Sequence, residues 1–163
     1  MSFTVKNLLL AGAFLVFFLF ISDKMRTGLT FGEVVGFELM FTQNKAETTM
    51  KEWQIETVPS GKTKVAALLE NTRFDFFYII GYVFFGVFLA RVAAGEGRIG
   101  TANTITWLLV VAGLCDMVEN LQILQILKGN FGLRPMVMSV CAAVKFLLLV
   151  VSLGWAVVLF AKR

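Results

Sequence analysis

The chain has 163 residues, of which 58% are hydrophobic and 17 are phenylalanine, and its formal net charge is +4. A soluble domain is usually about 45–50% apolar, and here the excess is gathered into long runs, which is typical of membrane spans. The basic residues are scattered and no nucleic-acid-binding motif is present, so a nucleic acid partner is not expected. The chain has no histidine, which excludes His-based acid–base chemistry, His-ligated haem and most zinc or copper sites.

Four apolar runs predict an all-α fold: an integral membrane four-helix transmembrane bundle that forms a single membrane domain over residues 1–163. The expected spans cover about residues 7–22, 74–94, 104–127 and 136–160. The last three runs reach the length of about 20 residues that a helix needs to cross a bilayer. Because the connections between these three runs are short, we expect them to be antiparallel neighbours.

The first run begins after Lys6 and is similar to the core of a signal peptide. The residues that follow it, Ser22-Asp-Lys-Met-Arg26, contain no small-residue cleavage site. We therefore expect an uncleaved signal anchor with both termini in the cytoplasm. Basic residues occur on both expected sides of the membrane, so the positive-inside rule does not decide the orientation.

Residues 23–73 are too polar to span a membrane and are expected to form a helical loop between the first two spans. Thr30-Phe-Gly-Glu33 is a capping box, which predicts the start of a short helix. Thr42 is placed to cap a second one, and both helices are amphipathic. Short amphipathic helices beside a membrane are expected to lie in the interface or to cover the bundle. A further helical stretch, residues 63–71, leads into the second span.

The third run contains three polar residues, Asp116, Glu119 and Asn120, whose spacing puts them on one face of a helix. Ionisable groups at membrane depth are costly and rarely face lipid, so this face is a candidate functional site. The only basic residue well inside the fourth run is Lys145. Glu38 interrupts an apolar face of the first short helix, where it is expected at the mouth of the group.

The register of the antiparallel hairpins predicts which polar residues lie at the same depth. The turn between the third and fourth spans places Lys145 beside Asp116 and Glu119. The turn between the second and third spans places Tyr82 level with Asp116, and Tyr78 level with Asn120. An error of two positions moves a side chain by only about 3 Å along the helix axis. Polar residues from three spans are therefore expected to converge in one layer.

The converging residues carry more carboxyl groups than amines. Burial and a neighbouring like charge both disfavour an ionised carboxyl. At least one of Asp116 and Glu119 is therefore expected to be protonated, or to hold a cation or the cationic part of a ligand. The candidate acid–base residues are Asp116, Glu119 and Lys145. The candidate ligand-binding residues are Glu38, Asp75, Tyr78, Tyr82 and Asn120, and no metal ligand or cofactor is assigned.

Three functions are compatible with this pattern. The leading hypothesis is a pocket that binds, with or without turnover, a lipid-like amphipathic small molecule, so membrane lipid and such a molecule are the expected partners. The alternative is an accessory or scaffold subunit of a larger membrane complex, in which the polar residues only staple the helices. The third is proton or cation movement, which with so few spans would need an oligomer. An oxygen-only site for Mg²⁺ or Ca²⁺ is a further alternative.

Several stretches of the chain together resemble a family of small four-span bacterial inner-membrane proteins that have no assigned activity. The stretches are Phe37-Glu-Leu-Met-Phe-Thr42 with Ala46 and Trp53, Asp75-Phe-Phe-Tyr-Ile-Ile-Gly-Tyr82, Ala112-Gly-Leu-Cys-Asp-Met-Val-Glu-Asn120, and Lys145-Phe146. The resemblance covers most of the chain after the first span. It implies four spans and a bacterial inner membrane, and it implies no mechanism.

Overall fold

The structure is a computed structural model that describes residue 17, residues 27–94 and residues 96–161. The described part is helical and contains no β-strand, only an isolated bridge between Thr57 and Thr63. Three of its helices are long and apolar enough to cross a membrane, which agrees with the expected second, third and fourth spans. They are α4 (Lys64–Ala94), α5 (Ile99–Ile126) and α6 (Arg134–Ala161). The expected first span, residues 7–22, lies outside the described residues except for Phe17.

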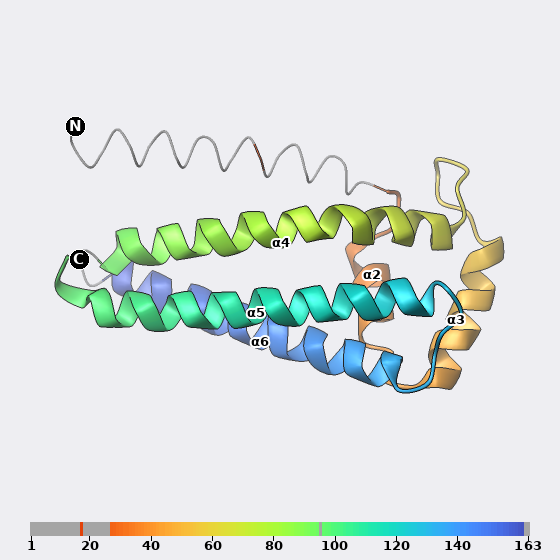
Figure 1. Cartoon of the computed structure of the whole chain (residues 1–163). Helices are drawn as coiled ribbons and strands as arrows, with labels where there is room; N and C mark the ends of the chain where they lie inside the picture. Colours follow the sequence, from red (N-terminus) through yellow and green to blue (C-terminus); the bar gives the residue numbers. More distant parts are fainter. Residues whose placement is uncertain (1–16, 18–26, 95, 162–163) are drawn as a thin grey trace.

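Helix α5 packs along both α4 and α6, while α4 and α6 contact each other less (Figure 1). The short helices α2 (Phe31–Glu38) and α3 (Gln43–Ile55) lie at the end of the bundle where α4 begins and α5 ends. A 3₁₀ turn, η1 (Glu96–Arg98), lies between α4 and α5 at the other end. Residues 23–73 therefore include the predicted pair of short helices, which cover one end of the bundle.

The long helices extend beyond the predicted spans. Helix α4 begins at Lys64 rather than near residue 74, because the predicted helical stretch over residues 63–71 continues into the span without a break. Helix α5 begins at Ile99 rather than near residue 104, because the turn η1 leads directly into it. The apolar runs indicate which part of each helix can lie in lipid. The helices are longer than these runs because their backbone hydrogen bonding continues into the flanking polar residues.

The capping box predicted at the start of α2 is present. The Thr30 backbone N–H donates to Glu33 Oε2 at 2.7 Å, and the Glu33 backbone N–H donates to Thr30 Oγ1 at 3.2 Å. Thr42 occupies the N-cap position of α3 without a side-chain capping bond. Lys64, at the start of α4, has its Nζ 2.7 Å from Glu33 Oε1 and 2.5 Å from Glu56 Oε2. One lysine thus holds α2 and the end of α3 against α4.

Buried apolar residues form two separate clusters, one at each end of the bundle. The cluster at the α2–α3 end comprises Phe37, Met40, Ala46, Met50, Trp53, Leu68, Ile123, Ile126 and Met138. The cluster near η1 comprises Ala90, Ala93, Ala94, Ala102, Ile105, Leu109 and Leu159. Among the described residues no apolar cluster of this kind fills the middle of the bundle, and the buried polar residues lie there.

Two glycines allow α4 and α5 to approach closely. A Cβ atom at Gly113 would lie 2.7 Å from Val83 Cγ2, and one at Gly86 would lie 2.8 Å from Leu109 Cδ1. Small residues at helix contacts in membranes let the backbones come close enough for side chains on both helices to interact. The Gly113 contact lies three residues before Asp116, so it sets the distance between α4 and the polar face of α5.

Candidate functional site

Lys145 lies at the centre of the buried polar residues. Its Nζ donates hydrogen bonds to Asp116 Oδ1 at 2.9 Å and to Glu119 Oε1 at 3.0 Å, and Glu119 Oε2 lies 2.9 Å away. Glu38 Oε2 is 3.7 Å from the same Nζ. Lys145 is 6% exposed and Glu119 is fully buried. Because an uncompensated charge at this depth is costly, these pairs bind α2, α5 and α6 to one another.

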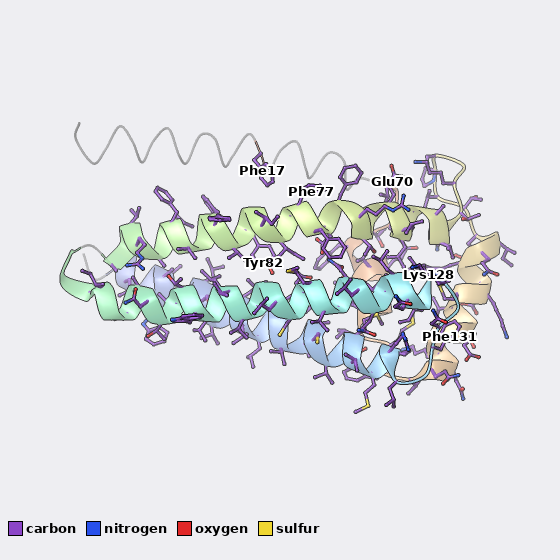
Figure 2. The ribbon with its side chains drawn as sticks, viewed as in Figure 1. Phe17, Glu70, Phe77, Tyr82, Lys128 and Phe131 are labelled. Carbon is purple, nitrogen blue, oxygen red and sulfur yellow. The ribbon has the colours of Figure 1, made fainter. Side chains whose placement is uncertain are left out.

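A second set of hydrogen bonds joins α4 to α5. The Tyr82 hydroxyl donates to Asp116 Oδ2 at 3.0 Å, and Tyr82 lies between the two helices (Figure 2). The Asn120 side-chain amide donates to Asp75 Oδ2 at 2.7 Å. Asp116 therefore accepts from Tyr82 with one oxygen and from Lys145 with the other, and it links α4 to α6 through α5.

The convergence predicted from the hairpin registers is present. Lys145 contacts Asp116, and Tyr82 contacts Asp116, as the two turns require. Asn120 bonds to Asp75, which precedes Tyr78, the residue predicted to be level with Asn120, by three positions on α4. The ring centroids of Tyr78 and Tyr82 are 6.0 Å apart, so both tyrosines lie on the same face of α4.

A cavity of about 630 Å³ opens beside this cluster, and α2, α4, α5 and α6 all contribute to its wall. Its polar lining consists largely of the predicted residues Glu38, Asp75, Tyr78, Tyr82, Asp116, Asn120 and Lys145. Towards η1 the lining is apolar and includes Phe85, Leu89, Ile105, Leu109, Leu149, Leu153 and Ala156. The cavity therefore combines a polar section with a long apolar section.

Glu119 is the one predicted site residue that does not line the cavity. It is fully buried and holds Lys145 with both carboxylate oxygens. The structure thus separates the three candidate acid–base residues: Asp116 and Lys145 face the cavity, whereas Glu119 positions Lys145 from behind.

Ser139 was not identified from the sequence, yet it places Glu38. Its hydroxyl donates to the Glu38 backbone C=O at 2.7 Å and accepts from the Phe41 N–H at 2.9 Å. Phe41 has φ +46°, a conformation that is unusual for a bulky residue. The only signal in the sequence was a small hydroxyl residue inside an apolar run, which is not specific.

Ser152 is a second site residue that the sequence alone did not identify. It is 2% exposed and lines the cavity, and its Oγ has no hydrogen-bond partner in the part of the chain that the structure describes. It follows Lys145 by seven residues on α6, which places it two helical turns away on the same face. The apolar section of the cavity therefore contains one buried hydroxyl.

The site carries a surplus of acidic groups. Glu38, Asp75 and Asp116 line the cavity, Glu119 lies behind it, and Lys145 is the only basic residue among the described residues of its wall. Burial raises the pKa of Glu38, against the attraction of Lys145, which lowers it. In the described residues no group of three or more Cys, Asp or Glu is arranged to hold a metal ion. The ammonium group of Lys145 lies among the carboxylates instead.

The fold and the site define a helical protein with three helices able to cross a membrane and a buried ion cluster beside a cavity. Comparison with protein-family models, curated proteins and solved structures finds no match to the chain.

Proposed function

We propose that the protein is an integral membrane protein that binds a lipid-like amphipathic small molecule in the cavity beside Lys145. The observation that carries the proposal is the division of this cavity into a polar section and an apolar section. Its volume of about 630 Å³ lies within the range of small-molecule sites, about 300–1,000 Å³. A soluble polar metabolite would leave the apolar section unfilled, and a pure hydrocarbon would leave the carboxylates unsolvated.

The length of the cavity also fits a chain-bearing molecule. On α4 its lining runs from Leu68 to Leu89, which corresponds to about 30 Å along the helix axis. On α4 the polar lining residues run from Asn71 to Tyr82, and the lining from Phe85 to Leu89 is apolar. A head group at the level of Tyr82 therefore leaves about two helical turns of apolar wall on α4, as far as Leu89, for a chain extending towards η1.

Within this proposal the cluster residues have different roles. Asp116 and Lys145 contact the head group, with Tyr82 orienting Asp116. Glu119 holds the Lys145 ammonium in place. Proton transfer to or from a bound molecule, if the protein turns it over, falls to Asp116 and Lys145, because these two of the three acid–base candidates line the cavity.

We also propose that the chain forms a four-span bundle in a bacterial inner membrane, with residues 7–22 as the first span and both termini in the cytoplasm. Support comes from the apolar first run and from the even number of spans that it would complete. Reporter fusions at the C-terminus and in the loop between α2 and α4 test this orientation. A C-terminal reporter active only outside the cytoplasm would contradict it.

The binding proposal is tested by native mass spectrometry of the full chain purified in mild detergent. Leu153 lines the cavity and Leu147 does not, although the two are almost equally exposed at 64% and 63%. We expect a co-purifying small molecule with the natural protein and with Leu147→Trp, and its loss with Leu153→Trp. A natural protein without any bound molecule would favour the alternative in which the polar cluster only staples a scaffold subunit.

A further inference from the structure

We infer that the cavity selects an amphiphile whose head carries hydrogen-bond donors, an ammonium or a hydroxyl, and excludes one with a phosphate head. This inference rests on the proposed binding function and names the chemistry of the molecule bound. Three features of the cavity carry it: the charge balance of its polar wall, an oxygen of Glu38 that receives no hydrogen bond from the described residues, and the hydroxyl of Ser152.

The charge balance of the polar wall favours a cation or a neutral donor. Lys145 is the only basic residue among the described lining residues, and Asp116 and Glu119 already accept its hydrogen bonds. Asp75 accepts from an uncharged amide, that of Asn120. The wall therefore offers Asp75 without a cationic partner among the described residues and Glu38 at 3.7 Å from one, while its one cation already has closer carboxylates at Asp116 and Glu119. Charge-assisted hydrogen bonds to carboxylates are about twice as strong as neutral ones.

Glu38 supplies an acceptor that receives no hydrogen bond from the described residues, although Lys145 is near enough to pair with its charge. Glu38 is 8% exposed and lines the cavity, and its Oε2 has no hydrogen-bond donor in the described part of the chain. The nearest cation, Lys145 Nζ, is 3.7 Å away, which is beyond hydrogen-bonding distance. A buried polar atom of this kind is costly unless it is paired. A donor on the head group of a bound molecule would satisfy it.

Ser152 supplies a second polar contact farther along the same wall. Its Oγ is buried, lines the cavity and has no partner among the described residues. It lies seven residues after Lys145 on α6, which corresponds to about 10 Å along the helix axis. The occupant therefore carries a polar atom about 10 Å from its head, within a mainly apolar chain.

The same polar wall is unfavourable to a phosphate head group. Phosphate sites in proteins are built from basic side chains and backbone N–H groups that are free to donate. Here the phosphate would lie beside Glu38, Asp75 and Asp116, and it would compete with two carboxylates for the single lysine. Repulsion and the cost of breaking these ion pairs both oppose its binding.

The test uses three photoreactive probes with the same twelve-carbon chain, a diazirine near its end, and an amine, alcohol or phosphate head. The full chain is labelled in lipid nanodiscs, and the modified peptides are identified by mass spectrometry. We expect the amine probe to label residues near Leu89 and Leu153 at least about tenfold more than the phosphate probe, because tenfold corresponds to a single charge-assisted hydrogen bond. The alcohol probe should label the same residues.

Two matched variants locate the head group. Glu38→Gln should reduce labelling by the amine probe several-fold and leave labelling by the alcohol probe nearly unchanged. Glu47→Gln removes a carboxylate from the exposed face of α3 and should change neither. Circular dichroism and size-exclusion chromatography confirm that each variant is folded, and a Glu38→Asp variant tests the charge with the least change in shape.

The outcomes separate this inference from the proposed function. Cavity labelling by the phosphate probe that equals or exceeds labelling by the amine probe would overturn the inference and leave the binding function standing. Absence of cavity labelling by all three probes, or equal labelling of every lipid-facing segment, would overturn both. Equal effects of Glu38→Gln and Glu47→Gln would also overturn the inference.

Discussion

The Nζ of Lys145 on α6 lies 2.9 Å from Oδ1 of Asp116 on α5, inside a bundle of helices able to cross a membrane. The other oxygen of Asp116 accepts the hydroxyl hydrogen of Tyr82 on α4. One carboxylate thus joins all three long helices. It also faces the cavity, so the same group contributes to the packing of the bundle and to the proposed binding site.

Replacing Lys145 by Met should destabilise the bundle by about 3 kcal/mol or more, because it leaves Asp116 and Glu119 buried without a cation. Asp116→Leu should also destabilise, and the double variant should lose less stability than the sum of the single variants. The expected coupling energy is about 0.5–3 kcal/mol. Reversible unfolding in mixed micelles, followed by circular dichroism, measures the three values. Additive losses would show that the two side chains do not act together.

Gly113→Ala should weaken the contact between α4 and α5. The added Cβ would lie 2.7 Å from Val83 Cγ2, and such overpacking costs about 1–3 kcal/mol. The new contact should also weaken the bond between Tyr82 and Asp116, which lies next to it. Gly154→Ala is the matched control, because no atom of the described residues lies within 4 Å of its Cβ position. The control should be neutral or stabilising by up to about 1 kcal/mol, since alanine favours a helix. Thermal unfolding measures the stability of both variants. Equal unfolding midpoints would contradict the close approach of α4 and α5 at Gly113.

Ser139→Ala should loosen the turn between α2 and α3. It removes a donor to the Glu38 C=O and leaves the Phe41 N–H without its acceptor. The expected loss is about 1–3 kcal/mol, the cost of an unpaired buried group. Hydrogen exchange read by mass spectrometry should become faster over residues 38–42. Ser152→Ala, the same change on the same helix, removes no hydrogen bond within the described chain and should leave this exchange unchanged.

Acid should weaken the attachment of α2 to α4. The hydrogen bond from Lys64, together with those from Thr30, lowers the pKa of Glu33 from 4.5 to about 2. A carboxyl with a depressed pKa in the folded state stabilises the fold above the ordinary pKa of 4.5, and this contribution is lost as the pH falls towards 2.

We therefore expect the stability difference between the natural protein and Glu33→Gln to be constant above about pH 5 and to shrink between pH 4.5 and 2. Because the pair lies near the surface, the difference should not exceed about 1 kcal/mol. Thermal unfolding at several pH values measures it. A difference that grows as the pH falls would contradict the assigned role of Glu33.

Apolar run length and helical spacing are sufficient to predict the long helices and the depth of the polar residues. Depth could be predicted because the rise per residue is constant in an antiparallel hairpin, so the turn fixes which residues lie level. Lys145 and Tyr82 both meet Asp116 for this reason. The start of α2 could be predicted because the bonds between Thr30 and Glu33 are local.

Only the tertiary structure decided which side chains face the cavity. Rotation of a helix about its axis and the choice of side-chain rotamer depend on packing against neighbours, which spacing in the sequence does not specify. Glu119 therefore lies behind Lys145 rather than in the cavity wall. Ser139 and Ser152 acquire their roles only through groups distant in the chain or through the cavity itself. The cavity exists because the apolar clusters fill the two ends of the bundle and leave its middle to polar residues, an outcome of packing over the whole fold.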